Sequence, residues 1–367
     1  DSCGSTEARS GVYRRAHGVR NSYTVTVTMK VVMLSTDRTL LNPESPISKR
    51  MQRYATFCDG LAIILSGHGE RKEEARGTVK IIYPGGQNKV SNFFNIVEAV
   101  RREPATVVSA QDPFWMGLAA LLSGQRPIQM QIHTDHFGPL GILLAFFTLR
   151  SASCVRAMTD VVAKKARRMT SASVSVLPIF IDPEQFGPRH PRPVEFGTHP
   201  IVLMVARLAP EKRLELGIRT LTHVPTAHLY IIGDGSQRSN LERAARAAEV
   251  SDRVHFLGWR DYTLPYYQHA DCFLQTSAYE GYGMALVEAM LSGCPVLSTD
   301  VGVAREWGAT IVSPREYDIA SAIQNVLENP EAKAAAERAA NEFLSRLPSE
   351  EQHLAEYRDL LITCGNP

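Results

Sequence analysis

Short apolar runs alternate with segments of helical periodicity along the front half of the chain. Strands are predicted at 29–35, 61–66, 78–82, 105–109, 127–132, 153–157 and 173–177, and helices at 47–58, 91–101, 112–123 and 159–168. Nearly unbroken apolar strands separated by helices are typical of parallel β-α-β units, because helices cover both faces of such a sheet.

The same alternation resumes after a proline-rich stretch. Residues 178–200 hold six prolines, a density that excludes a regular helix or a central strand. Strands are predicted after it at 201–206, 229–232, 254–258, 271–275, 296–299 and 311–314, and helices at 262–269, 318–328, 331–345 and 349–362. Because 367 residues are too many for one ordinary core, we expect an α/β protein with two Rossmann-like, doubly wound parallel-sheet domains that face each other across a cleft.

These patterns divide the chain into five parts. The leading residues 1–28 are rich in Ser, Arg and Gly, and we expect them to be disordered or to lie upstream of the natural start. A first domain at 29–180, a linker at 181–199 and a second domain at 200–345 follow, and a last helical segment occupies 346–367.

The stretch from Thr276 to Met290 combines a strand end, a glycine loop and a helix, with Glu280 and Glu288 eight positions apart. Gly281 and Gly283 allow a ligand to approach the backbone closely. The N–H groups of the first helical turn have no intrahelical partner, so they suit a phosphate. Glu288 either receives hydrogen bonds from a ligand such as a ribose or faces water on an amphipathic helix, and its spacing leaves both readings open.

Two cations and a glycine turn follow other strands of the second domain. Arg207 and Lys212 come just after strand 201–206, where they could clamp a diphosphate. Gly233, Asp234 and Gly235 follow the next strand. A dinucleotide fingerprint would need a third glycine where this chain has arginine, so the turn fits a structural connection equally well.

Polar residues also follow two strands of the first domain. His133 lies just past strand 127–132 and could bind a sugar hydroxyl, transfer a proton, or hold a metal with Asp135 and His136. A structural hydrogen bond is the commoner role for such a histidine. Asp37 and Arg38 lie in the loop after the first strand, at the carboxyl end where open α/β sheets bind ligands.

An apolar run at 137–149 is too short to span a bilayer. A buried core helix is the commoner explanation, and the alternative is a helix that dips into a membrane interface or lines a groove for a lipid-linked acceptor. Residues 29–180 carry a net charge of +8 and residues 181–367 carry −8. This asymmetry favours either two domains that attract each other or a basic surface for an anionic membrane or acceptor.

Six scattered cysteines without a Cys-x-x-Cys pair argue against a zinc site and against a disulfide framework, and reduced thiols are the simplest interpretation. No run reaches 18 apolar residues and no signal-peptide core is present. We therefore expect a cytoplasmic protein, with the inner face of the membrane as the alternative.

The sequence Glu-Gly-Tyr-Gly-Met-Ala-Leu-Val-Glu-Ala-Met at 280–290 resembles the E-x7-E motif of glycosyltransferase family 4, whose members are retaining enzymes with the GT-B fold. The resemblance implies that Glu280 lies by the donor sugar and Glu288 binds the ribose. Arg207 and Lys212 match the family's Arg-x4-Lys pair on the diphosphate, and His133 matches a histidine beside the donor sugar and the acceptor.

The resemblance also assigns the domains and the wider site. It implies an acceptor-side domain at 29–180, a donor-binding domain at 200–345 and a last helix that can cross back onto the first domain. The expected catalytic residues are Glu280, Arg207, Lys212 and His133. Donor-binding residues are expected at Glu288, Gly281, Tyr282, Gly283, Met284, Ala285, Leu286, Gly233, Asp234 and Gly235, and acceptor-side residues at Asp37, Arg38, Asp135 and His136.

The implied reaction moves a hexose-type sugar from a UDP-, GDP- or ADP-sugar to a hydroxyl of a glycan, lipid-linked or small-molecule acceptor, as in cell-envelope polysaccharide biosynthesis. No cofactor, metal or nucleic acid is expected, since the cations can stabilise the leaving diphosphate and no Asp-x-Asp triplet is present. Many relatives carry glycines in the first loop, whereas this chain has none between Met29 and Asp59. A non-catalytic sugar-nucleotide-binding protein and a nucleotide-sugar epimerase of the same fold are the alternatives.

Overall fold

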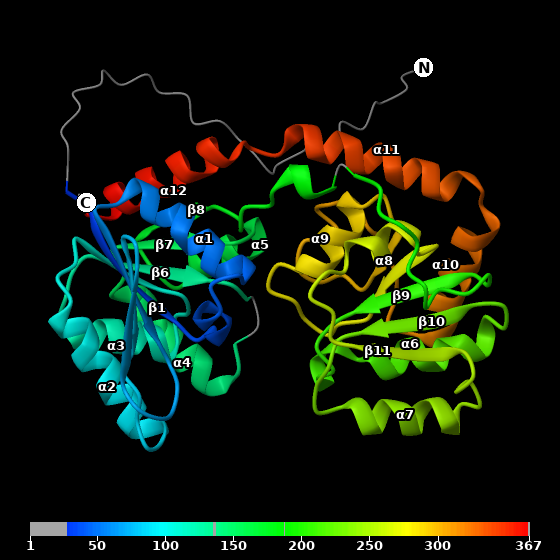
Figure 1. The fold of residues 1–367 in the computed structure, drawn as a ribbon, viewed down its shortest axis with the longest axis horizontal. Coiled ribbons are helices and arrows are strands. Elements are labelled where there is room, and N and C mark those ends of the chain that lie inside the picture. Colours follow the sequence, from blue (N-terminus) through cyan, green and yellow to red (C-terminus); the bar gives the residue numbers. More distant parts are fainter. Residues whose placement is uncertain (1–27, 135–136, 187, 366–367) are drawn as a thin grey trace.

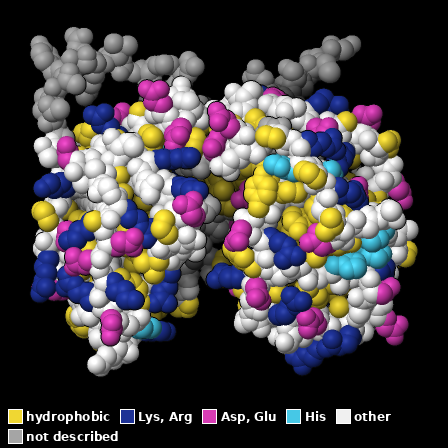
Figure 2. Space-filling model, viewed as in Figure 1, with side chains coloured by type: hydrophobic (Ala, Val, Ile, Leu, Met, Phe, Trp, Pro, Cys, Tyr) yellow, Lys and Arg dark blue, Asp and Glu magenta, His cyan; other side chains and the backbone are white. Residues whose placement is uncertain are grey.

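The computed structural model describes residues 28–134, 137–186 and 188–365, and it arranges them as two α/β domains side by side (Figure 1). Each domain is built around one open, largely parallel sheet. A groove separates the two domains at the surface (Figure 2). Within the described part of the chain, no helix has both the length and the apolar character needed to cross a bilayer.

The first domain has an eight-stranded sheet in the order β3-β4-β2-β1-β5-β6-β7-β8. Its strands are β1 Lys30–Ser35, β2 Gly60–Leu65, β3 Lys72–Arg76, β4 Val79–Tyr83, β5 Val107–Ala110, β6 Ile128–Ile132, β7 Cys154–Ala157 and β8 Ser173–Val176. Its helices are the 3-10 turns η1 Arg38–Leu41 and η2 Ala55–Phe57, and α1 Pro46–Tyr54, α2 Lys89–Arg102, α3 Trp115–Ser123, α4 Pro139–Arg150 and α5 Asp160–Ala166.

The second domain follows the short η3 turn Pro183–Phe186 and has a six-stranded parallel sheet in the order β11-β10-β9-β12-β13-β14. Its strands are β9 Ile201–Val205, β10 His228–Ile232, β11 Val254–Gly258, β12 Cys272–Gln275, β13 Val296–Ser298 and β14 Thr310–Ile311. Its helices are η4 Pro210–Lys212, α6 Leu214–Thr220, η5 Leu221–His223, α7 Arg238–Ala247, α8 Leu264–His269, α9 Met284–Leu291, α10 Glu316–Glu328 and α11 Glu331–Arg346, and α12 Glu350–Gly365 ends the described chain.

In both sheets the order in which strands are added reverses at a central strand. In the first domain β1 pairs in parallel with β2 on one side and β5 on the other. In the second domain β9 lies between β10 and β12 in the same way. The expected fold class, two doubly wound Rossmann-like domains, is therefore correct, and such reversal points are where open α/β sheets bind ligands at their carboxyl edge.

Two elements of the first domain differ from the prediction. Strand β3 was not predicted because Lys-Glu-Glu-Ala-Arg contains no apolar run, and it forms an antiparallel edge against β4. The preferred interpretation of 137–149 as a buried core helix is wrong for most of α4. Its exposed apolar side chains are Leu140, Ile142, Leu143, Phe146 and Phe147.

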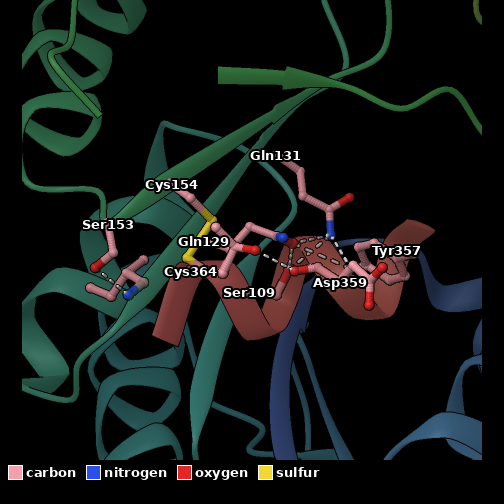
Figure 3. Close-up of a disulfide and its surroundings, with 10 residues drawn as sticks. Ser109, Gln129, Gln131, Ser153, Cys154, Tyr357, Asp359 and Cys364 are labelled. Atoms are coloured by element: carbon pink, nitrogen blue, oxygen red, sulfur yellow. Dashed lines mark hydrogen bonds between the residues drawn. A yellow bond between two sulfur atoms is a disulfide. The ribbon is translucent and has the colours of Figure 1, made fainter. Parts of the chain in front are cut away.

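Helix α12 packs against the first domain, although it follows the second domain in the sequence (Figure 1). The Tyr357 side chain is fully buried, and its hydroxyl accepts a hydrogen bond from Gln131 Nε2 at 3.0 Å. Cys364 at the end of α12 forms a disulfide with Cys154 on β7 (Figure 3). The expectation of no disulfide is thus wrong, because the two cysteines are 210 positions apart and only the returning helix brings them together.

Candidate functional site

The loops after β9 and β12 are held together at the reversal point of the second sheet. Arg213 has left-handed backbone angles, with φ 47° and ψ 38°. Its guanidinium donates to the carbonyl oxygens of Thr276 at 2.8 Å and Ser277 at 2.7 Å. In return, the Thr276 hydroxyl donates to the carbonyl of Lys212 at 2.9 Å. These bonds fix the cation-bearing loop against the start of the E-x7-E stretch.

Lys212 and Glu280 meet at the centre of this arrangement. Lys212 Nζ lies 2.6 Å from Glu280 Oε1, and the two side chains are only 18% and 12% exposed. The Ser277 hydroxyl donates to the same carboxylate oxygen at 2.7 Å. A largely buried lysine can exchange its carboxylate partner for a more highly charged anion, so this pair is a candidate diphosphate site.

Arg207 lies on the solvent-exposed side of the loop after β9. Its side chain is 71% exposed, and its guanidinium contacts Glu211 Oε1 at 2.8 Å. A surface ion pair of this kind contributes little to stability, so the guanidinium is free to turn toward an incoming anion at low cost.

Gly283 begins helix α9 in the left-handed conformation, with φ 93°. Val287 N donates the first intrahelical bond, to the Gly283 carbonyl at 3.1 Å. No side chain among the described residues caps this end. The N–H groups of Met284, Ala285 and Leu286 therefore form a cluster of donors that is suited to an anion.

Glu288 is half-buried inside α9 rather than fully turned to water. The hydroxyl of the fully buried Tyr267 donates to Glu288 Oε2 at 3.1 Å. Burial raises the pKa of the Glu288 carboxyl, while the tyrosine hydrogen bond opposes that shift. A further hydroxyl donor at this carboxylate would offset part of the cost of its desolvation.

The glycine turn after β10 packs against the loop after β9. A Cβ on Gly233 would collide with the carbonyl oxygen of Ala206, and one on Gly235 would lie 2.5 Å from that of Leu208. The Asp234 carbonyl accepts a hydrogen bond from Leu208 N at 2.9 Å. Glycine is therefore required in this turn for a structural reason, because any side chain would collide with the loop after β9. The turn supports that loop, which carries Arg207 and Lys212.

His133 brings the first domain to this site. A Cβ on Gly281 would overlap the His133 carbonyl oxygen, so the two backbones are in direct contact across the groove. Among the described residues, none hydrogen-bonds the buried His133 Nε2. Burial, aided by the nearby cations Arg156 and Arg50, lowers the pKa of His133 to about 3. The imidazole is therefore neutral at pH 7.

Comparison with known proteins agrees with this geometry. Residues 188–343 match the family "Glycosyl transferases group 1". This group 1 segment contains the cation loop, the glycine turn and the E-x7-E stretch. The chain is 35% identical over 100 residues to the lipopolysaccharide core biosynthesis glycosyltransferase LpsE of Rhizobium meliloti, an alignment that covers 27% of this chain and 29% of that one. The chain spans less than two thirds of the length of the first curated relatives it matches, between 29% and 59% of each.

Solved structures match almost the whole chain. Sucrose-phosphate synthase from Thermosynechococcus elongatus superposes with a TM-score of 0.75 at 17% identity, covering 90% of this chain and 98% of that one. The Anabaena protein HepE in complex with UDP and glucose gives 0.72 at 17% identity, covering 91% and 100%. The fold is GT-B, with the group 1 segment forming its second domain.

Of the four residues expected on the acceptor side, the structure describes Asp37 and Arg38. Asp37 caps η1, since its carboxylate accepts from Thr39 N at 2.9 Å. The exposed Arg38 hydrogen-bonds the Tyr83 hydroxyl and lies over that ring, 5.6 Å from its centroid. Asp135 and His136 lie outside the described residues.

Sequence reasoning missed the glycine loops after β2 and β4. The Asn92 amide donates to the carbonyls of Gly67 at 2.6 Å and Gly85 at 2.9 Å, and so ties the two loops together. Gly85 and Gly86 both have positive φ, 70° and 146°. The signal was available, because Gly67 directly follows predicted strand 61–66, and Gly85-Gly86 come three residues after the end of predicted strand 78–82, in the region where ligand loops are found.

Proposed function

We propose that this protein is a retaining hexosyltransferase of the family 4 type, which moves a sugar from a nucleoside-diphosphate sugar to an acceptor hydroxyl. The observation that carries the proposal is the largely buried ion pair of Lys212 and Glu280, which lies next to Gly281, where the backbone of His133 makes contact. The group 1 match supports a transferase. The hexose, the retention of configuration and the acceptor are part of the proposal.

Lys212 acts as the principal stabiliser of the leaving group in this proposal. The diphosphate arrives between Lys212, Arg207 and the N–H groups at the start of α9. Lys212 then shifts from Glu280 to the phosphate, and the carboxylate it leaves turns to the hydroxyls of the donor sugar. Negative charge grows on the diphosphate as the anomeric bond breaks, so these preorganised groups bind the transition state more tightly than the donor.

The chemical step follows from that charge distribution. The bond between the anomeric carbon and the diphosphate oxygen breaks, and its electron pair stays with the diphosphate. The acceptor oxygen bonds to the same face of the anomeric carbon, and its proton passes to the departing phosphate oxygen. Glu280 positions the sugar and does not attack it. His133, neutral because burial and two cations lower its pKa, holds a sugar hydroxyl. No metal or cofactor takes part in this scheme.

Glu288 binds the nucleoside half of the donor. The Tyr267 hydroxyl donates a hydrogen bond to one of its carboxylate oxygens, and no described residue donates one to the other. A ribose hydroxyl can fill that position. HepE, whose fold is the same, binds UDP and glucose, which supports a UDP-sugar as the first donor to test beside GDP- and ADP-sugars.

The apolar face of α4 supports a lipid-linked acceptor at an anionic membrane surface. Five large apolar side chains of this helix are exposed. Cations flank the helix, since the Arg150 guanidinium lies over the Phe146 ring at 4.3 Å and Lys165 Nζ lies over the Phe137 ring at 4.5 Å. Apolar residues with neighbouring cations are typical of helices that lie in the interface of anionic membranes. We accordingly propose a cytoplasmic location at the inner face of the membrane.

Liposome sedimentation tests the membrane contact. The protein should sediment with vesicles that contain an anionic phospholipid, and less with purely zwitterionic ones. Changing both Leu143 and Phe147 to glutamate should leave it in the supernatant. Equal sedimentation of the variant would refute the α4 interface without affecting the proposed reaction.

The transferase proposal is tested by donor binding and by one substitution. A panel of UDP-, GDP- and ADP-sugars should contain a donor that raises the melting temperature of the purified protein. With that donor, Lys212→Ala should lower kcat/KM by roughly 30- to 900-fold, which is about 2–4 kcal/mol of transition-state stabilisation. Lys72→Ala, on the exposed strand β3, is the matched control. Unchanged kcat/KM in Lys212→Ala would exclude the mechanism.

The two alternatives predict other outcomes of the same assay. A nucleotide-sugar epimerase would convert the donor without an acceptor. A sugar-nucleotide-binding protein would be stabilised by the donor and would neither hydrolyse nor transfer it. Either result would replace the transferase proposal.

A further inference from the structure

Three histidines gather at the amino edge of the second sheet. His199 precedes β9 by two residues, His228 is the first residue of β10, and His255 is the second residue of β11. The register pairs His228 with Ile201 and Tyr230 with His255. Since side chains along a strand alternate between the two faces, all three histidines lie on the same face of the sheet.

The three imidazole rings lie close together. One nitrogen from each histidine lies within 4.8 Å of the other two. His228 Nδ1 and His255 Nε2 are 2.8 Å apart. The His199 ring stacks on the His228 ring with centroids 3.3 Å apart. All three side chains are half-buried, and Figure 2 shows histidine side chains gathered at the surface over β10 and β11.

The proposed transfer reaction does not use this cluster. Lys212 follows the carboxyl end of β9, whereas the histidines lie at the amino ends of the same strands. The length of a five-residue strand such as β10 places the two sites roughly 15 Å apart. The cluster therefore lies apart from the pair of Lys212 and Glu280 on which the proposed reaction depends.

We propose that His199, His228 and His255 form a binding site for a divalent transition-metal ion of the class that prefers imidazole ligands, represented by Zn²⁺. Three histidine nitrogens with one open position are a common ligand set for this ion. Ligand nitrogens around tetrahedral zinc are about 3.3 Å apart, given Zn–N bonds of about 2.0–2.1 Å. The 2.8 Å separation of His228 and His255 needs to widen only slightly.

Ring orientation is the main adjustment that the site requires. Stacked imidazoles direct their in-plane lone pairs along parallel lines, so His199 or His228 must rotate for both to reach one ion. The terminal torsion of histidine is broad, which keeps the cost of that rotation small. Tyr230 limits the rotation of His199, because its hydroxyl lies 3.0 Å from His199 Nε2 and donates to the Glu195 carbonyl at 3.0 Å.

Charged groups of both signs lie around the cluster. Asp252 acts electrostatically on His228 and His255 in the sense that favours a cation, whereas Arg253 opposes it at His228 and Arg192 opposes it at His199. The Arg253 guanidinium is occupied by three backbone carbonyls, which include Leu221 and Val224. A bound ion would link the amino ends of β9, β10 and β11 to one another. The sequence contains no motif for such a site, because successive histidines of the cluster are 29 and 27 positions apart.

Equilibrium dialysis of the full chain without a histidine tag against Zn²⁺ tests the site. One ion per chain should bind, and the affinity should fall at least about tenfold in His228→Ala, since even outer-shell changes weaken metal sites by about 10- to 100-fold. His68→Ala, an exposed histidine of the first domain, is the control and should keep the wild-type affinity. No binding at one equivalent, or equal affinity in His228→Ala and wild type, would overturn the proposal.

A second variant protects the test against misfolding of β10. His255→Gln keeps the size and polarity of the side chain at a half-buried position, and it should lose zinc affinity by the same order while its melting temperature without metal stays close to that of the wild type. X-ray absorption of the zinc-loaded wild type should show three imidazole ligands. Sulfur ligands, or oxygen ligands alone, would overturn the assignment. Thermal stabilisation by nucleotide sugars should be unchanged in His255→Gln, which separates this inference from the proposed transferase function.

Discussion

Replacing Gly281 by alanine tests whether the two domains must meet as closely as they do here. A Cβ at this position would overlap the carbonyl oxygen of His133 and would lie only 2.9 Å from its carbonyl carbon. Gly281 does not have a left-handed backbone, so alanine adds steric overlap without backbone strain. The obstruction is backbone on the His133 side, which cannot rotate away as a flexible side chain would.

The size of the effect follows from the overlap. The new Cβ would lie 1.7 Å from the His133 carbonyl oxygen, so the two loops must separate by about 1.3 Å to bring that distance to 3.0 Å. A displacement of this size at a reacting centre costs on the order of 100-fold in rate. We therefore expect kcat/KM of Gly281→Ala to fall about 100-fold. The overlap lies between domains and can be relieved by opening them, so the melting temperature should change by only a few degrees.

Three measurements separate closure from folding. Transfer kinetics with the donor found in the panel give kcat/KM, thermal unfolding gives stability, and small-angle X-ray scattering should show a larger radius of gyration for Gly281→Ala. Gly60→Ala, where an added Cβ meets nothing within 4 Å, is the matched control. A Gly281→Ala protein with kcat/KM within about threefold of wild type and unchanged scattering would refute the need for this contact.

Two further predictions concern the carboxylate of Glu288 in α9 and the buried His353. Glu288→Ala should raise the donor Kd by about 10-fold or more with little change in kcat, because a hydrogen bond to a charged group contributes about 1.5–3 kcal/mol; an unaltered donor Kd in isothermal titration would disprove a ribose contact. Burial, aided by Arg156 and Arg50, lowers the pKa of His353 to about 3, so the unfolded chain takes up this proton first as the pH falls. The stability contributed by the neutral ring is therefore complete above pH 6.5 and is lost between pH 6.5 and about 3, by up to about 1.4 kcal/mol per pH unit. His353→Phe should flatten that part of the urea-unfolding profile, and a slope equal to wild type would contradict the assignment.

The sheets and the loops of the candidate site could be predicted because their signals are local. Apolar runs identified the seven parallel strands of the first domain. Strand β3 was not predicted because its sequence, Lys-Glu-Glu-Ala-Arg, contains no run of apolar residues. The spacing of Glu280 and Glu288 and the position of Arg207 and Lys212 after a strand gave the candidate site. None of these patterns could reveal that Lys212 is paired with Glu280, since that contact depends on Arg213 fixing two loops 63 positions apart.

Features that depend on long-range packing could not be read from the chain. The apolar run of α4 has the composition of a core helix, and only the position of α3 and the sheet decides that most of its side chains face outward. The disulfide of Cys154 with Cys364 depends on the return of α12. The histidine cluster depends on strand register, because His228 and His255 share a face only through the pairing of β10 with β11.

The path of the chain between the domains restricts how the cleft can open. The chain crosses twice, at the proline-rich linker and at residues 347–349 between α11 and α12, and both crossings run along the upper side of Figure 1. Phe343 near the end of α11 stacks on Trp307 of the second domain at 5.0 Å, whereas Cys364 holds α12 to the first domain. We therefore expect each helix to move with the domain it packs on, so that rotation is confined to the short segments between them. We expect the groove to open by a hinge motion about that side, with the contact of Gly281 and His133 as its closed limit.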